Sequence, residues 1–181
     1  MSDATSTSEP KAQEAAFADR LYGLSKRAKK DGSARATLAR LRRTISRRGV
    51  DPMAYREVGA MLPRDLSERE RETYLLVAAL YAIHAAKSEA PWYGGYVGTE
   101  DGFGVSCGKL RGNSGSMDLR FSALLDARRE DLPYRLRQAI SLLAASGNDI
   151  GVRYDRLLDD LLSWDAPRRP VQRRWAADYW T

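Results

Sequence analysis

The amino-acid sequence predicts an all-α fold made of two small helical bundles joined by a Gly-rich linker. Apolar residues recur every three or four positions through most of the 181 residues, the spacing of a helix packed on one side. No run of four or more residues clearly alternates between apolar and polar side chains, as a half-buried strand does. A hydrophobic fraction of 43% is ordinary for a globular protein, so the chain can enclose a core.

The N-terminal half is predicted to form one bundle over residues 10–87, after a disordered tail at residues 1–9. Its first helix is expected over residues 10–27, where three apolar side chains share one side: Phe17, Leu21 and Leu24. The second helix is expected to begin at the N-cap Ser33 and to end at Gly49, because hydroxyl side chains cap N-termini and glycine favours C-termini.

Two more helices are predicted in this half. Asp51 places an N-cap before Pro52, so a short helix should follow and end before Pro63. Ser67 and Glu70 have the spacing of a capping box ahead of a long helix that is apolar on most of its sides. That long helix is therefore expected at the centre of the protein.

Residues 88–104 are predicted to link the two halves. They form the only extended Gly-rich, helix-breaking stretch of the sequence. The aromatic side chains Trp92, Tyr93 and Tyr96 can stack on bases, although aromatic residues in loops more often pack on their own domain. The glycines match neither common phosphate-binding loop pattern.

The C-terminal half, residues 105–181, is predicted to form the second bundle. Its helical segments are expected around residues 106–111, over 116–127, from the cap Asp131 to Gly147, over 154–164, and through Val171, Trp175 and Tyr179. Short amphipathic helices with short links are typical of a small bundle.

Positive charge is concentrated near the N-terminus. The chain has a formal net charge of +6. Residues 1–60 hold 13 Lys and Arg against 7 Asp and Glu, whereas residues 61–181 hold 17 of each. Over residues 26–48, ten basic residues stand against a single acidic one, Asp31. Such a density is typical of a segment that contacts a polyanion, and solvated charge is the alternative interpretation.

Three arginines are predicted to lie on one face of the second helix. At about 100° per residue, Arg40, Arg43 and Arg47 fall opposite an apolar stripe. Arg35 and Arg42 flank that stripe. The row spans about 10 Å and is able to follow phosphates, although proteins that bind nothing also carry such faces. Membrane-surface binding fits less well, because an interfacial helix usually has a wide apolar face.

The sequence shows no recognisable catalytic or metal-binding pattern. One His and one Cys are too few for a disulfide or a structural zinc site. His84 has no ligand at metal spacing on its helix, so a structural role is expected. Asp155 and Asp159 are able to share a metal, but with Asp160 they fit better as the solvated face of a helix. We expect no enzymatic activity, no cofactor, no bound metal and no small-molecule substrate.

A cytoplasmic location without membrane contact is also expected. The longest apolar stretch is far shorter than the roughly 20 residues that span a bilayer, and the first ten residues lack the pattern of a secretory signal.

Seven short motifs, in a fixed order, cover nearly all of the chain after its first ten residues. They are LRR at 41–43, LYAIH at 80–84, GVSCGKL at 104–110, RFSALLDA at 120–127, LRQAISLL at 136–143, YDRLLDDLLSW at 154–164 and VQRRWAADYW at 171–180. Together they resemble the CasB family, the small subunit of the type I-E CRISPR Cascade surveillance complex. The Gly-rich segment before Gly104 departs from the usual family pattern.

The resemblance implies an all-helical, non-catalytic protein that forms a head-to-tail pair in an RNA-guided complex. The implied partners are a second copy of the chain, the backbone and large Cascade subunits, the guide RNA, and the target and non-target DNA strands. The implied role is to stabilise the R-loop by holding the displaced non-target strand and supporting the heteroduplex of guide and target. Because base pairing reads the sequence, the protein needs only sequence-blind contacts with phosphates.

Eight basic residues are predicted to bind nucleic acid. Six are carried over from the resemblance: Arg42, Arg43, Lys109, Arg120, Arg128 and Arg137. Two come from their place on the second helix: Arg40 and Arg47. The alternative hypothesis is a pure protein-interaction scaffold, in which these arginines contact acidic surfaces of partner subunits.

Overall fold

The computed structural model describes residues 12–46, 49–87, 102–112, 115–146 and 150–181. Over these residues it contains nine α-helices, two short 3-10 helices and one pair of strands. The first half contains α1 Ala12–Ala28, α2 Gly32–Thr44, β1 Ile45–Ser46, β2 Gly49–Val50, α3 Met53–Val58, η1 Gly59–Met61 and α4 Glu68–Ala85. The second half contains α5 Phe103–Gly108, α6 Gly115–Leu125, η2 Arg129–Asp131, α7 Leu132–Ala145, α8 Tyr154–Leu162 and α9 Pro170–Trp180. The predicted all-α class is confirmed.

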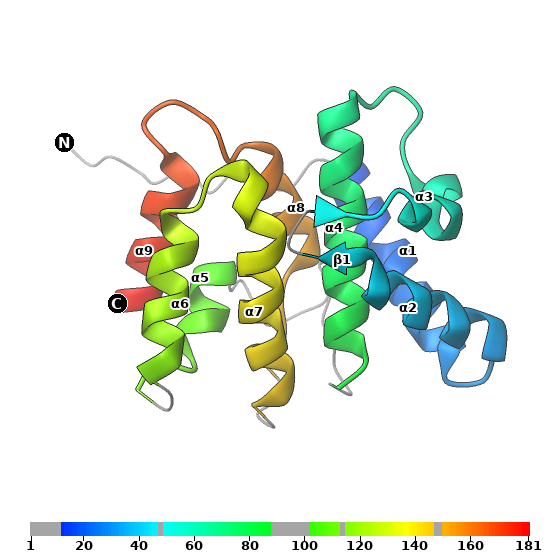
Figure 1. The fold of residues 1–181 in the computed structure, drawn as a ribbon, viewed down its shortest axis with the longest axis horizontal. Coiled ribbons are helices and arrows are strands. Elements are labelled where there is room, and N and C mark those ends of the chain that lie inside the picture. Colours follow the sequence, from blue (N-terminus) through cyan, green and yellow to red (C-terminus); the bar gives the residue numbers. More distant parts are fainter. Residues whose placement is uncertain (1–11, 47–48, 88–101, 113–114, 147–149) are drawn as a thin grey trace.

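The long helix α4 lies near the centre of the molecule (Figure 1). The predicted capping box is present at its start, where the Ser67 N–H donates to the Glu70 carboxylate at 2.7 Å and the Glu70 N–H donates to the Ser67 hydroxyl at 3.3 Å. Eleven of its 18 residues are buried. Because α2, α3, α7 and α8 all pack against it, α4 organises both halves of the chain.

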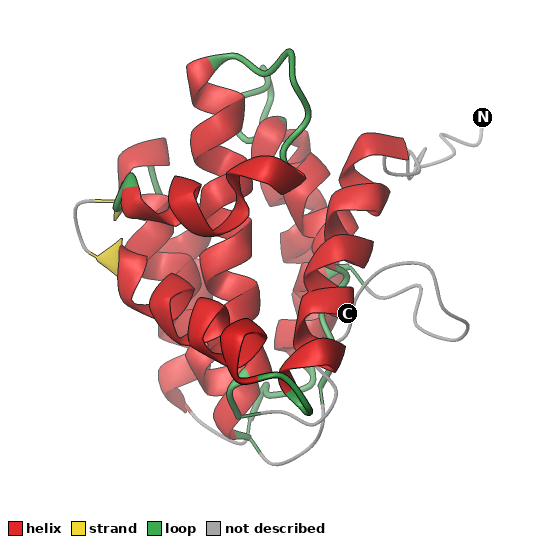
Figure 2. Ribbon diagram, turned by 90° about the vertical axis from the view of Figure 1, so that its right-hand side faces the viewer, coloured by secondary structure: helices red, strands yellow, loops and turns green. Residues whose placement is uncertain are grey.

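Helix α2 ends earlier than the sequence predicted. It stops at Thr44 rather than at Gly49, and the chain then forms a short antiparallel strand pair in which Ile45 lies opposite Val50. The β-branched side chains at positions 44, 45 and 50 favour extended backbone. Gly49 has a φ of 117°, a backbone conformation that favours glycine, and it is the first residue of β2 and not the C-cap of a helix. The strand pair lies at the edge of the helical body (Figure 2).

The helix caps follow the sequence in part. Asp31, and not Ser33, caps α2: its carboxylate accepts the Ser33 N–H at 2.8 Å. At α3 the Asp51 carboxylate accepts the Met53 N–H at 2.8 Å, so this aspartate caps the short helix as predicted. Asp131 precedes α7, but its side chain makes no capping hydrogen bond there.

The two halves of the chain pack directly on each other. Helix α8 contacts α1 and α4, and α7 also contacts α4. The rings of Tyr81 and Tyr154 meet edge to face across this contact, 5.0 Å apart. Buried side chains from both halves therefore form one continuous cluster. The division into two bundles stays a prediction, and most of its linker, residues 88–101, lies outside the described residues.

The last residues of the predicted linker are helical. Helix α5 begins at Phe103, about three residues before the expected start near Ser106, and packs along α9. The Phe103 and Trp175 rings lie 4.8 Å apart. A Cβ on Gly104 would lie 2.6 Å from the Trp175 carbonyl oxygen, so the contact of α5 with α9 requires glycine at this position. Packing on α9 thus explains why this glycine lies inside a helix.

Candidate nucleic-acid interface

Helix α2 exposes part of the predicted basic row. Leu38 and Leu41 are buried in the core, and α2 packs on α1 and α4. Arg40 and Arg43 are exposed on its outer side, as the helical spacing predicted, whereas Arg42 is half-buried. The third member of the row, Arg47, lies outside the described residues.

Arg40 is already engaged by a carboxylate that the sequence did not reveal. Its guanidinium donates to both oxygens of Glu57 on α3, at 2.6 and 2.9 Å, and to the Thr37 hydroxyl at 3.2 Å. The hydrogen bonds from Arg40 hold the pKa of Glu57 below its ordinary value, so the carboxylate is charged and neutralises the arginine. Arg40 therefore joins α2 to α3 and is a weaker phosphate ligand than its exposure suggests.

Arg137 brings a basic residue of the second half to the end of α2. It lies on α7, and its guanidinium donates to the Ile45 carbonyl oxygen at 2.9 Å. This carbonyl follows Arg43 by two residues. The bond leaves the positive charge of the exposed Arg137 unneutralised, so the structure joins these two predicted residues into one basic region on α2, β1 and α7.

Two of the remaining predicted residues, Lys109 and Arg120, belong to the end of the molecule opposite α2. Lys109 follows α5 and is exposed, Arg120 is half-buried on α6, and Arg128 is exposed just before η2. Helices α5 and α6 lie opposite α2 along the long axis (Figure 1). Arg128 does not belong to that end, because the residues that follow it, Arg129 and Glu130, line a pocket together with Gly49 and Val50 of β2. The predicted residues that the structure describes are therefore spread along the molecule and do not form one patch.

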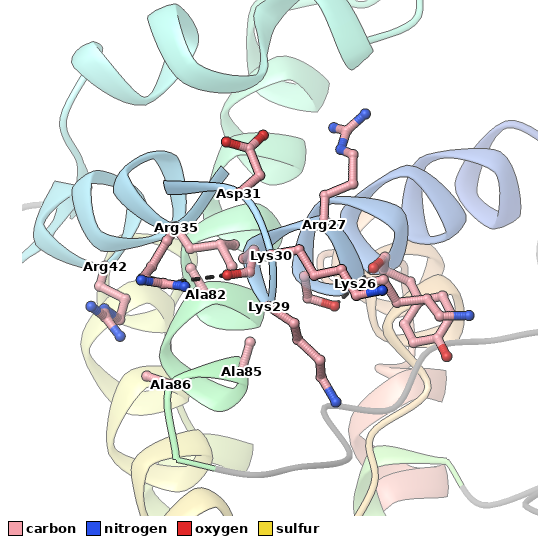
Figure 3. A pocket seen from close by; sticks show the side chains of 14 residues that line it. Lys26, Arg27, Lys29, Lys30, Asp31, Arg35, Arg42, Ala82, Ala85 and Ala86 are labelled. Atoms are coloured by element: carbon pink, nitrogen blue, oxygen red, sulfur yellow. Dashed lines mark hydrogen bonds between the residues drawn. The ribbon is translucent and has the colours of Figure 1, made fainter. Parts of the chain in front are cut away.

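The structure also gathers basic residues that the predicted set left out. Arg42 lines a groove of about 1010 Å³ between the end of α1, the α1–α2 turn, α2 and the last turn of α4 (Figure 3). We call this the α1–α2 groove and define it by its six basic residues: Lys26, Arg27, Lys29, Lys30, Arg35 and Arg42. The charge density of residues 26–48 was the sequence signal, but spacing along one helix did not show that a turn would fold beside Arg42.

Two acidic side chains of α8 are buried, which corrects the prediction of a solvated face. Asp155 pairs with Arg153, with an Nη2 to Oδ2 distance of 2.5 Å. Asp160 accepts the Trp175 indole N–H at 2.6 Å and pairs with Arg174. Helix α8 is covered by α1 and α4, and Asp160 is reached from α9, so the face predicted to be wet is enclosed. Both carboxylates serve the fold.

The part of the chain that the structure describes contains neither a candidate metal site nor a candidate membrane span. Within those residues no three His, Cys, Asp or Glu side chains gather as metal ligands, and no helix is long and apolar enough to span a membrane. His84 is buried, with its Nδ1 3.0 Å from the Tyr154 hydroxyl, and burial lowers its pKa to about 4. Burial raises the pKa of the Cys107 thiol well above its ordinary value, which leaves it protonated and unreactive.

The fold and surface define a class of small all-helical proteins with clustered surface arginines. The family model for the CRISPR-associated protein Cse2 matches residues 37–180. A curated CRISPR-associated protein Cse2 from Thermus thermophilus is 38% identical over 133 residues, which are 73% of this chain and 70% of that protein. The chain belongs to the Cse2 family, and the resemblance to CasB is confirmed.

Solved structures agree with this assignment. The crystal structure of CasB from Thermus thermophilus has a TM-score of 0.68 and 34% identity, covering 90% of this chain and 96% of that one. A chain of a solved CRISPR RNA-guided surveillance complex has a TM-score of 0.65 over 92% of both chains. Its 23% identity shows a shared fold.

Proposed function

We propose that this protein is a non-catalytic subunit of a Cascade complex that binds nucleic acid through its basic helix faces. In this proposal it stabilises the R-loop by holding the displaced non-target DNA strand and supporting the heteroduplex of guide RNA and target. The other Cascade subunits and a second copy of the chain are its protein partners.

The observation that carries the proposal is the presence, in both halves of the chain, of exposed guanidinium groups without carboxylate partners. Arg43 on α2 and Arg128 before η2 are exposed, and among the described residues neither forms an ion pair with an acidic side chain. Each can therefore give its full charge to a phosphate and release a condensed counterion. Arg40, Arg129 and Arg153, in contrast, are held by carboxylates.

The rigid helix that carries Arg43 also supports a contact with the phosphate backbone of a nucleic-acid strand. Arg43 projects from a helix whose other face is buried in the core, so little backbone order has to be acquired on binding. Phosphate contacts position a nucleic acid without reading its sequence. That property suits a subunit of a complex in which base pairing supplies the specificity.

A double variant tests this function in the assembled complex. Arg43→Ala with Arg128→Ala removes one unpaired charge from each half of the chain, and Arg64→Ala with Arg173→Ala removes the same charge from two other exposed positions. We expect both to assemble normally and the first alone to shorten the R-loop lifetime at 0.1 M salt. Two lost phosphate contacts predict a reduction of about 25-fold.

The alternative, a pure protein-interaction scaffold, is supported by exposed apolar side chains at both ends of the long axis. Leu119 on α6 is 76% exposed and Trp180 on α9 is 47% exposed. On α3, at the other end, Met53 is 54% and Tyr55 is 48% exposed. If the Arg43 and Arg128 variant failed to enter the complex while the control entered it, the scaffold function would replace the proposed one.

A further inference from the structure

The α1–α2 groove concentrates more positive charge than any single helix face of the predicted set. Lys26 and Arg27 come from the last turn of α1, and Lys29 and Lys30 come from the turn that follows (Figure 3). Arg35 and Arg42 come from α2. Among the residues that the structure describes, Asp31 is the only acidic one that lines it. At about 1010 Å³ the groove is at the upper limit of the volumes that hold small ligands, so it has room for a stretch of chain and not only for an ion.

Negative groups of the protein itself neutralise only part of the positive charge in the groove. The helices α1 and α4 both end at the groove, and each C-terminus carries roughly half a negative charge. Asp31 adds one more. With Lys29 left out of the count, five basic side chains face about two negative charges from the described residues, and a surplus of about three remains. Arg35 donates to the Ala28 carbonyl at 3.3 Å, and Lys26 lies 4.9 Å from the centre of the Tyr22 ring, but neither contact removes a charge.

The floor of the groove is apolar and made of small side chains. Ala82 and Ala85 of α4 line it together with Ala86, which follows that helix, and Leu38 of α2. A ligand that fits this arrangement has closely spaced negative charges for the rim and a less polar part that can lie over the alanines. One strand of nucleic acid has both, because each nucleotide brings a phosphate and a sugar. A peptide would need a run of consecutive acidic residues to match the surplus.

Most basic residues of the groove precede the part of the chain that the Cse2 family model matches, whereas its floor lies within that part. That match begins at residue 37, so five of the six basic residues precede it and only Arg42 lies within it. None of those five belongs to the residues assigned to strand binding above. The charge of the groove therefore comes mostly from residues outside the region that the family model matches.

We propose that the α1–α2 groove binds the sugar-phosphate backbone of a single nucleic-acid strand, as a contact site separate from Arg43 and Arg128. This inference rests on the proposed function, because the strand is one that the complex already holds. The rim cations meet the phosphates, and the alanine floor lets the sugars approach α4 without a side chain in the way.

A salt titration of the full chain tests the site. The probes are fluorescent 20-mers of dT and U and a fluorescent 20-mer of glutamate, with the affinity of each followed from 50 to 300 mM NaCl. The groove variant combines Lys29→Ala, Lys30→Ala and Arg42→Ala. A charge-matched control combines Arg56→Ala, Arg64→Ala and Arg173→Ala, all exposed and away from the groove lining. Thermal unfolding of both variants checks that the fold is kept.

We expect the groove variant to lower the slope of log K against log salt by about two and the affinity for dT or U about 100-fold at 0.1 M salt, with a much smaller loss in the control. A preference of the site for dT or U would show which strand it serves. Equal losses in the two variants would overturn the groove site. A larger loss for oligoglutamate than for dT and U would assign the groove to an acidic protein instead.

The Arg43 and Arg128 variant separates this proposal from the proposed function. If that variant loses affinity and the groove variant matches its control, the function stands and the groove site is wrong. If the wild-type chain binds neither dT nor U at 50 mM salt, both fail.

Crosslinking gives a second readout that does not depend on charge. Because Cys107 is fully buried, a cysteine introduced on the surface can be labelled selectively with a photoreactive group. Ala86→Cys lies in the groove, and Ala177→Cys lies on α9 at the other end of the molecule. We expect the dT strand to crosslink at position 86 and not at 177. Equal crosslinking at both positions would contradict a defined strand site.

Discussion

An exposed arginine is useful to a phosphate only if no carboxylate already neutralises it. Arg40 and Arg43 lie one turn apart on α2 and are both exposed, yet Glu57 binds Arg40 through two hydrogen bonds. The sequence placed the two on the same helix face, and that is correct. It did not reveal Glu57, because the carboxylate comes from α3 and reaches α2 only through the fold.

Releasing Arg40 from Glu57 should strengthen strand binding. The Glu57→Gln variant keeps the shape of the side chain and removes its charge, which leaves Arg40 free to meet a phosphate. We expect a higher affinity for a dT oligonucleotide and a steeper salt dependence, measured by fluorescence anisotropy. Arg40→Ala should change the affinity less than Arg43→Ala. The reverse order would show that the pair with Glu57 does not persist in solution.

The buried His84 should make stability depend on pH in the weakly acidic range. The unfolded imidazole binds a proton near pH 6.5, whereas burial holds the folded pKa at about 4. Between these values the unfolded state binds more protons, so the free energy of unfolding falls as the pH is lowered. The expected loss between pH 7 and pH 5 is about 2 kcal/mol. Urea unfolding at several pH values measures it, and His84→Gln should remove most of the slope. An unchanged slope in that variant would contradict the assignment to His84.

At the scale of helices, local signals were reliable where the local sequence decides the structure. The Ser67 and Glu70 capping box marked the start of α4 correctly, and an unbroken apolar pattern placed this helix at the centre. The end of α2 was wrong because the strand pair of Ile45 and Val50 competes with the helix, and short-range spacing does not show such a pairing.

Two glycines in helices should respond to alanine with opposite signs. Gly104 of α5 touches α9, where a Cβ would lie 2.6 Å from the Trp175 carbonyl oxygen, so Gly104→Ala should destabilise the protein by about 1–3 kcal/mol. Gly23 of α1 has open space around its missing side chain, so Gly23→Ala should stabilise it by roughly 0.5–1 kcal/mol. Thermal unfolding compares the two. Stabilisation by Gly104→Ala would mean that α5 and α9 are less closely packed than described.

At the scale of the whole molecule, the sequence named candidate basic residues but did not show how they are arranged. Helical spacing identified Arg43 as exposed, and the family motifs pointed to Lys109, Arg120 and Arg128. Spacing could not show that Lys109 and Arg120 lie away from Arg43, because their positions depend on how α5 and α6 pack on α7 and α9. The α1–α2 groove was missed for the same reason: its rim comes from a turn and its floor from α4.

The apolar ends of the molecule should mediate a head-to-tail contact between copies. Met53→Ser and Leu119→Ser each remove one of the two contacting ends, so either variant should weaken self-association in sedimentation experiments. Mixing the two should restore one interface, because the intact α3 end of the Leu119 variant meets the intact α6 and α9 end of the Met53 variant. An isologous contact would show no such restoration, and that result would contradict a head-to-tail pair.

Nuclease probing of the displaced strand tests the central claim most directly. R-loops are formed by complexes that contain either the wild-type chain or the Arg43→Ala and Arg128→Ala double variant, at equal subunit content. We predict that the wild-type complex protects the non-target strand from a single-strand nuclease and that the variant exposes it, while cleavage of the target strand is unchanged. Equal protection in the two complexes would contradict the account.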